Sequence, residues 1–199
     1  MNKIIGNFII SLIFLFSLTS CLRTIYGIKN YEEPSKSQMN KYAMKWGIDT
    51  TINYLTLDSI RYIDLLNNKS LDSLTLNNLK QPLQWQFYDS SGNLTCFVPN
   101  CNVGGFPNLK WNREQFISEY PPTNSDCAAE TKINLNELFD ACQEPYRLLA
   151  VGKTNVVVYW SVFMGRQSKV MIEKLKEYLD KYPREDRKII YVNIDDLIL

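Results

Sequence analysis

The chain has 199 residues, 45% of them hydrophobic, and its 22 basic and 21 acidic residues leave a formal net charge of +1 at pH 7. This neutral balance, without clusters of basic residues, does not predict the basic surface that nucleic-acid-binding proteins use to contact phosphates. The absence of histidine excludes Ser-His-Asp and Cys-His catalysis in their usual forms and histidine-based zinc or haem sites, so acid–base catalysis would have to use carboxylates, lysine or tyrosine. No catalytic residue, metal or cofactor is predicted.

The first 21 residues have the three parts of a bacterial export signal. Lys3 supplies a positive charge, residues 4–18 form an almost uninterrupted apolar stretch, and Leu-Thr-Ser-Cys at 18–21 follows directly. This tetrapeptide resembles the lipobox of bacterial lipoproteins, which implies cleavage before Cys21 and lipidation of that cysteine. An uncleaved membrane anchor or an ordinary secretory signal is the alternative, but the apolar stretch is short for a span of about 20 residues.

The predicted organisation is a signal peptide at residues 1–20, a lipidated tether at 21–38 and one α/β domain at 39–199. The tether mixes charged residues, Pro34 and serines with few apolar side chains. No acidic cluster of the kind that resembles a surface-export signal follows Cys21. We therefore expect a lipid anchor in the outer membrane with the domain on the periplasmic face, and the cell surface is the alternative.

The first part of the predicted domain has a mixed pattern. Residues 39–47 predict a short helix that Gly47 stops, and residues 51–57 predict a strand because they are rich in β-branched and aromatic side chains. Asp58 is expected to start a helix over residues 58–66. Leucines recur among Asn and Ser in residues 67–80, which indicates a loop with short helical turns.

Residues 82–98 have the clearest hairpin pattern. Leu83, Trp85 and Phe87 alternate with more polar residues, a turn at 89–92 contains Gly92, and residues 94–98 return. The alternation predicts that these three side chains face the core. Residues 100–122 follow as a long loop, whose aromatic side chains must be buried against the domain or bound to a partner.

Four cysteines follow Cys21 in the chain, and an even number in an exported protein favours disulfides. Cys96 and Cys101 bracket a Phe-Val-Pro-Asn turn that would bring them together, which leaves Cys127 to pair with Cys142. Buried thiols are the alternative reading. A zinc site built from all four is disfavoured because the spacings contain no Cys-x-x-Cys knuckle.

The last third of the chain predicts an α/β unit. Asn134 is expected to start a helix over residues 133–142, and residues 148–159 lead into a strand without alternation, which implies helices on both of its faces. Ser168 is the predicted N-cap of the next helix, which Pro183 ends. Residues 189–194 form a second buried strand, parallel to the first. The predicted buried stripe of the helix is Ile172, Leu175, Leu179 and Tyr182.

Val-Val-Tyr-Trp-Ser at 157–161 and Tyr-Val-Asn-Ile-Asp at 191–195 resemble the opening βαβ unit of the thioredoxin superfamily. In that family the first strand runs into a Trp-Cys-x-x-Cys turn at the start of a helix. With Trp160 aligned on the aromatic residue that ends the family's strand, ahead of the Trp-Cys-x-x-Cys turn, the two thiol positions fall on Met164 and Gln167, so the resemblance implies the scaffold without its redox chemistry.

The family continues with a cis-proline loop, a hairpin and a final helix, whereas this chain stops at Leu199. The expected fold is therefore a partial thioredoxin-like three-layer α/β sandwich with a β-rich amino-terminal extension. Either the amino-terminal region fills the missing edge of the sheet, or the likeness is only local.

Met164, Gly165, Arg166 and Gln167, the degenerate redox-motif positions, are expected to be exposed at the helix N-terminus. Arg166 is electrostatically misplaced there, so it needs an acidic partner or a bound anion, or else it is solvated with its stem on Phe163. Asp195 and Asp196 are adjacent carboxylates near the end of a predicted strand, where α/β proteins often bind ligands. A turn at the end of the strand is a commoner reason for such a pair than a ligand site.

The leading functional hypothesis is a non-enzymatic lipoprotein, held on the membrane by its lipid anchor, whose degenerate thioredoxin-like domain binds an unknown protein or peptide. A thiol-disulfide oxidoreductase or assistant that uses Cys96 and Cys101 is the first alternative. An immunity-type lipoprotein that captures one exported toxin is the second. No nucleic-acid partner is expected.

Overall fold

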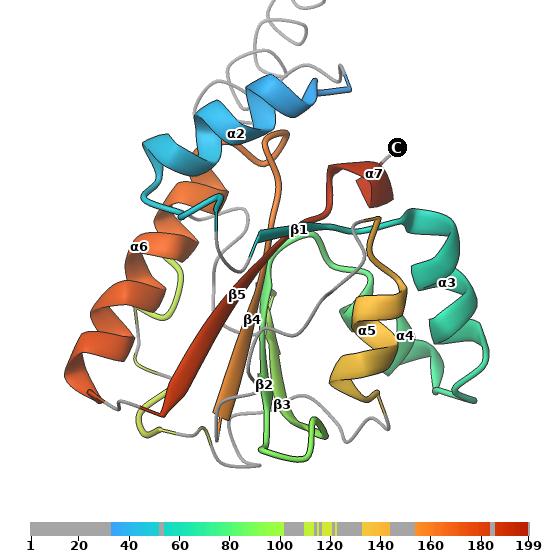
Figure 1. Ribbon diagram of the computed structural model, residues 1–199. Helices are drawn as coiled ribbons and strands as arrows, with labels where there is room; N and C mark the ends of the chain where they lie inside the picture. Colours follow the sequence, from blue (N-terminus) through green and yellow to red (C-terminus); the bar gives the residue numbers. More distant parts are fainter. Residues whose placement is uncertain are drawn as a thin grey trace, which may run out of the picture.

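A computed structural model describes residues 33–51, 54–101, 110–113, 115, 117–120, 122, 133–143, 154–183 and 186–198. Within these ranges six helices and five strands form an α/β protein with helices on both faces of one sheet (Figure 1). The predicted α/β class is confirmed. The predicted signal peptide, Cys21 and most of the tether lie outside the described residues.

The sheet is mixed and has the strand order β1-β5-β4-β2-β3. β4 and β5 are parallel, as predicted, and β1 is parallel to β5, whereas β2 runs antiparallel to both β4 and β3. Elements from the amino-terminal half of the chain therefore lie on both sides of the β4–β5 pair. The strands are β1 (Tyr54–Thr56), β2 (Gln84–Tyr88), β3 (Leu94–Pro99), β4 (Thr154–Trp160) and β5 (Arg187–Asn193).

Two helical layers cover the sheet (Figure 1). α2 (Lys36–Lys45) and α6 (Arg166–Lys181) lie on one face, and the other face carries α3 (Ser59–Asn67), α4 (Ser73–Leu79) and α5 (Leu135–Asp140). A short helix, α7 (Asp195–Ile198), follows β5.

β4 lies at the centre of the sheet and supplies side chains to both hydrophobic cores. Val156, Val158 and Trp160 pack in the core beneath α6. Val157 and Tyr159, which point the other way, pack in the core beneath α3 and α5. Burial on both faces accounts for the absence of alternation in this strand, as the sequence predicted.

Short polar side chains fix where several helices begin. The Asp58 carboxylate accepts a hydrogen bond from the N–H of Arg61, and Asn134 forms a capping box with Glu137, so both predicted N-caps are confirmed. α2 extends over Lys36–Lys45 behind a Ser35 cap, and Gly47, with a φ of 72°, ends it as predicted.

Lys176 ties α6 to the C-terminal end of α2. Its ammonium group donates hydrogen bonds to the carbonyl oxygens of Trp46 at 3.0 Å and Gly47 at 3.2 Å. A cation at this end of a helix satisfies carbonyls that have no partner within the helix and opposes the negative end of its dipole.

The polar residues of β2 are buried together with its apolar ones. Trp85 and Phe87 face the core beneath α6, as predicted, but Gln84 and Gln86 are also buried, because β2 is an interior strand with helices on both faces. The Gln86 side-chain oxygen accepts hydrogen bonds from the hydroxyl groups of Tyr88 at 2.6 Å and Tyr159 at 3.1 Å. The polar members of the alternation thus form an internal network rather than a solvated face.

The aromatic side chains described in the loop at residues 100–122 pack against the domain. The Trp111 ring lies 5.3 Å from that of Trp85, and the Tyr120 ring lies 6.1 Å from that of Phe87. Trp111 is 1% exposed. For these residues the loop is pinned to the domain by its aromatics, which was one of the two predicted alternatives.

Candidate functional site

The turn that the family resemblance singles out joins β4 to α6. It runs through residues 161–165, and α6 begins at Arg166 after Gly165, whose φ of 47° places it in the left-handed region. Ser168 is therefore not the N-cap, contrary to the prediction. Its hydroxyl group lies inside the first turn of α6 and donates a 2.6 Å hydrogen bond to the carbonyl of Ser161.

Asp195 closes the same turn from the end of β5. Its carboxylate accepts hydrogen bonds from the Ser161 hydroxyl at 2.5 Å, the Val162 N–H at 3.0 Å and the Phe163 N–H at 3.2 Å. The Asn193 side-chain amide donates a further bond at 2.8 Å. A buried carboxylate with four donors is held by charge-assisted bonds, which are stronger than neutral ones.

Asp195 is the first residue of α7, two positions after the end of β5, and these contacts give it a structural role there. Its neighbour Asp196 points elsewhere and accepts a 2.7 Å hydrogen bond from the Ser59 N–H at the start of α3. The two carboxylates therefore do not converge. No group of three or more acidic or cysteine side chains in the described part of the chain is arranged to hold a metal ion.

The four degenerate motif positions are not an exposed surface, contrary to the prediction. Met164 is 6% exposed and Gln167 is 2% exposed, Gly165 is also buried, and only Arg166 reaches solvent. Arg166 makes no ion pair with a described residue, so the solvated alternative fits it better than an acidic partner. A thioether and an amide cannot exchange with a disulfide, since that reaction requires a thiolate.

Two buried N–H donors near this turn have no acceptor among the described residues. They are Nε2 of Gln167 and Nε1 of Trp160. A buried donor without a partner carries a desolvation cost of about 1–3 kcal/mol. The amide of Gln167, in the first turn of α6, is therefore a destabilising feature.

The cysteines do not pair as the sequence suggested. Cys96 is disulfide-bonded, which confirms that the chain forms a disulfide. Cys101 and Cys142 carry thiols, however, so neither a Cys96–Cys101 nor a Cys127–Cys142 bridge forms. The partner of Cys96 and the placement of Cys127 lie outside the described residues.

Strand geometry explains why Cys96 and Cys101 stay apart. Cys96 points into the core beneath α6. The Cys101 sulfur lies instead against the end of α4, 2.8 Å from Nε2 of Gln81 and 3.8 Å from Oδ1 of Asn78. Cys142 is buried in the other core and donates to the carbonyl of Leu138. The predicted dithiol site is therefore wrong.

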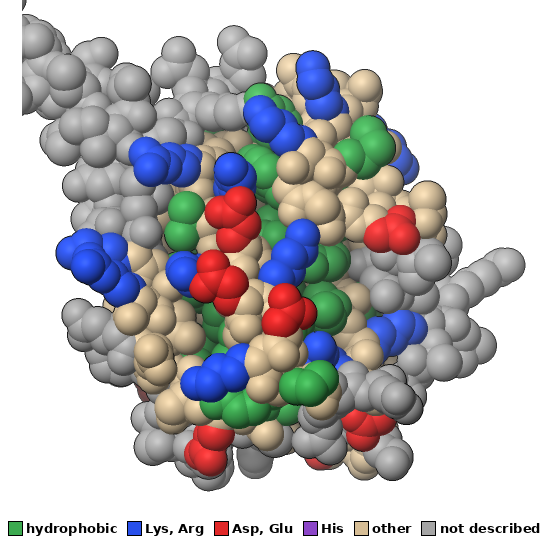
Figure 2. All heavy atoms as spheres, turned by 90° about the vertical axis from the view of Figure 1, so that its left-hand side faces the viewer, with side chains coloured by type: hydrophobic (Ala, Val, Ile, Leu, Met, Phe, Trp, Pro, Cys, Tyr) green, Lys and Arg blue, Asp and Glu red, His purple; other side chains and the backbone are tan. Residues whose placement is uncertain are grey.

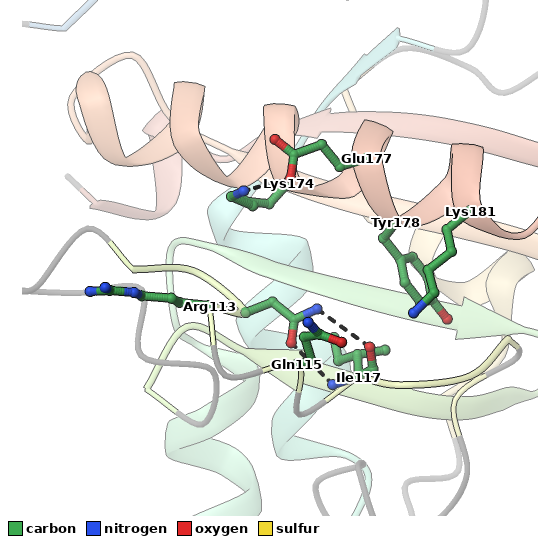
Figure 3. A pocket seen from close by; sticks show the side chains of 8 residues that line it. Arg113, Gln115, Ile117, Lys174, Glu177, Tyr178 and Lys181 are labelled. Atoms are coloured by element: carbon green, nitrogen blue, oxygen red, sulfur yellow. Dashed lines mark hydrogen bonds and ion pairs between the residues drawn. The ribbon is translucent and has the colours of Figure 1, made fainter.

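A second candidate site is a cleft of about 270 Å³ between α6 and the loop at residues 112–117, which we call the α6 cleft. α6 contributes Lys174, Glu177, Tyr178 and Lys181, and the loop contributes Asn112, Arg113, Gln115 and Ile117 (Figure 3). The described lining residues include three cations and one carboxylate, so this part of the lining carries net positive charge.

The α6 cleft could not be predicted from the sequence, because Arg113 lies about 60 positions from Lys174 and no local cluster of basic residues marks the site. Figure 2 shows that basic and acidic side chains are interspersed over the face of the molecule that α2 and α6 form. The helical spacing of Lys174 and Lys181 was the available signal, but nothing in the sequence placed Arg113 opposite them.

Comparison with protein-family models, curated proteins and solved structures finds no match for this chain. None of the helices in the described ranges is long and apolar enough to cross a membrane.

Proposed function

We propose that the protein is a lipid-anchored binding module in which a thioredoxin-like scaffold, without redox activity, holds a protein or peptide partner. One observation carries the proposal. The turn between β4 and α6 carries Met164 and Gln167 at the positions where the thioredoxin family has its thiols, and Asp195 holds that turn closed.

The sheet supports the thioredoxin-like part of the proposal. The β2–β3 hairpin pairs antiparallel with β4, on the side opposite β5. Pro82 comes two residues before Gln84, which pairs with Tyr159 close to the end of β4. A proline loop and a hairpin follow the βαβ unit in the thioredoxin family, whereas here a proline and a hairpin precede it.

We therefore infer a thioredoxin-like arrangement with a permuted chain order. The amino-terminal half of the chain would then supply the loop proline and the hairpin, which the family has after its βαβ unit. In this view Pro82 stands where the family's loop proline stands.

The cysteines support binding over thiol chemistry. Cys96 is engaged in a disulfide, and the contacts of the Cys101 thiol include the side-chain amides of Gln81 and Asn78. The oxidoreductase alternative needs Cys96 and Cys101 to act as a pair, but Cys96 is bonded to a cysteine other than Cys101. The oxidoreductase alternative is therefore less well supported.

The lipid anchor rests on the sequence pattern that ends at Cys21. We propose that this cysteine attaches the chain to the outer membrane and leaves the domain on the periplasmic face. Replacement of Cys21 by serine tests this point. The variant should leave the membrane fraction, and a variant that stays with the membrane would contradict the anchor.

The central test combines turnover and partner capture with the full-length protein. Disulfide reduction with insulin as substrate and dithiothreitol as electron donor should not exceed the uncatalysed rate. Cross-linking in the intact envelope, followed by mass spectrometry, should recover one exported protein in near-stoichiometric amount. Turnover that disappears in Cys101→Ser would overturn the proposal in favour of a thiol enzyme, and so would the absence of any cross-linked protein.

A further inference from the structure

We propose that the α6 cleft is the partner-binding site and that it takes an acidic peptide segment of an exported protein. This inference rests on the proposed function and deepens it, since it names a site and a class of ligand. It is carried by three basic side chains from two separate parts of the chain that line one cleft, where the described residues supply a single carboxylate, that of Glu177.

The described residues of the cleft do not fully neutralise its positive charge. Arg113 and Lys181 make no ion pair with any residue in the described ranges. Lys174 bonds Glu177 at 2.5 Å, but both side chains are well exposed, at 40% and 63%. Exposed pairs of this kind contribute about 0.2–1 kcal/mol, so a ligand carboxylate can replace Glu177 at little cost.

The placement of the cations favours an extended acidic chain over a single phosphate group. Lys174 and Lys181 are seven residues apart on α6, which corresponds to about 10 Å along the helix. Figure 3 shows their side chains at different ends of the cleft, pointing in different directions. An extended peptide rises about 3.3 Å per residue, so two of its carboxylates about three residues apart would span the same distance.

The wall opposite α6 is held in place before a ligand arrives. The Asn112 side chain accepts a hydrogen bond from the Ile117 N–H at 3.0 Å and donates to its carbonyl at 3.5 Å. Asn112 and Gln115 both have positive φ, at 47° and 55°, a backbone conformation that residues other than glycine rarely adopt.

Two tyrosines fasten the following residues to α6. The Tyr178 hydroxyl donates to the carbonyl of Glu119 at 2.6 Å, and the Tyr182 hydroxyl donates to the carbonyl of Ser118. A site with preformed walls loses less conformational entropy on binding than a flexible one. The exposed amide of Gln115 adds a group able to bond the peptide backbone.

The test measures binding of a fluorescein-labelled peptide, with glutamates at every third position and alanine and serine between them, to the full-length protein in neutral detergent. Lys174→Gln combined with Lys181→Gln should weaken the dissociation constant by about tenfold or more. Arg113→Gln, on the opposite wall, should weaken it as well. Lys36→Gln with Lys41→Gln on α2 removes the same charge outside the cleft and should leave it within about twofold.

Four results would overturn the inference: no measurable binding, equal binding of a peptide with glutamine in place of glutamate, equal weakening in the α2 control, or retention only on phosphatidylglycerol vesicles. Denaturation midpoints of the variants show whether a loss of binding reflects unfolding. If the Lys174/Lys181 double variant is unfolded, the dissociation constant of Arg113→Gln decides whether the cleft binds the peptide. A cross-linked exported partner that persists in the Lys174/Lys181 variant would leave the proposed function standing and overturn only this site.

Discussion

The Ser161 hydroxyl and the Asp195 carboxylate lie 2.5 Å apart, and this contact joins the end of β4 to the end of β5. Ser161 also accepts a hydrogen bond from the Met164 N–H at 3.1 Å. The turn ahead of α6 is thus shaped by a carboxylate that lies 34 positions away in the chain. The hydrogen bonds of this turn therefore have a structural role, since they connect the ends of β4 and β5.

Asp195→Asn should destabilise the protein by about 2–4 kcal/mol, because a neutral amide presents N–H groups to donors that the carboxylate now satisfies. Asp196→Asn removes the same charge one residue further on but affects a single hydrogen bond, that from Ser59, and should cost about 1 kcal/mol. Urea denaturation measures both. Equal losses would show that the Asp195 network does not hold the turn.

The elements that follow from local chemistry were predictable. Asp58 and Asn134 cap their helices, Gly47 ends α2, and β4 is buried on both faces, because each of these depends on neighbouring residues or on a local hydrophobic pattern. The failures depend on distant contacts. Burial of the motif positions requires Asp195 and the packing of α6, and Gln84 and Gln86 look solvated until the neighbouring strands are known.

The candidate site was predictable only in part, for the same reason. The sequence located the turn before α6 and the lack of thiols in it. It could not show that Cys96 points into the core whereas Cys101, beyond the end of β3, lies against the end of α4. Nor could it bring Arg113 to Lys174 and Lys181, because that proximity follows from the loop packing on α6.

Gln167→Met should leave stability unchanged or raise it by about 1 kcal/mol. The substitution replaces a buried amide, whose Nε2 has no acceptor among the described residues, by an apolar side chain of similar length. Gln86→Met is the matched control, since that amide accepts two tyrosine hydroxyls and should cost about 2–4 kcal/mol when lost. A loss of comparable size at Gln167 would indicate an unrecognised partner.

Stability should fall as the pH rises above about 10. Burial raises the pKa of Tyr191 to about 12, and it also raises the pKa values of Tyr62, Tyr88 and Tyr159 above the ordinary value of 10.0. Between the ordinary and the raised pKa, the unfolded chain releases tyrosine protons that the folded protein keeps. The free energy of unfolding then decreases with pH, by about 1.4 kcal/mol per pH unit for each such tyrosine.

Urea denaturation at a series of alkaline pH values measures this dependence, and tyrosinate absorbance should rise together with unfolding rather than before it. Tyr88→Phe removes one of the buried titrating groups, so its stability should fall less steeply with pH than that of the wild type. A constant free energy of unfolding across this range would mean that the tyrosines are not buried as described.

The scaffold itself can be tested by returning thiols to it. Met164→Cys with Gln167→Cys, in a Cys101→Ser background, places two thiols three residues apart at the N-terminal end of α6. Residues at this spacing are neighbours across a helical turn, and the thiol at position 164 should have a pKa below the ordinary value of about 8.5, because the helix N-terminus stabilises the thiolate.

We expect this dithiol to oxidise to an intramolecular disulfide, detected by mass spectrometry after thiol blocking, with the pKa measured from the pH dependence of alkylation. Lys174→Cys with Glu177→Cys has the same spacing in the middle of α6 and no helix N-terminus, so its thiols should titrate near about 8.5. If the introduced pair behaves like this control, the turn before α6 lacks the electrostatics of a thioredoxin-like site, and the proposed scaffold is wrong.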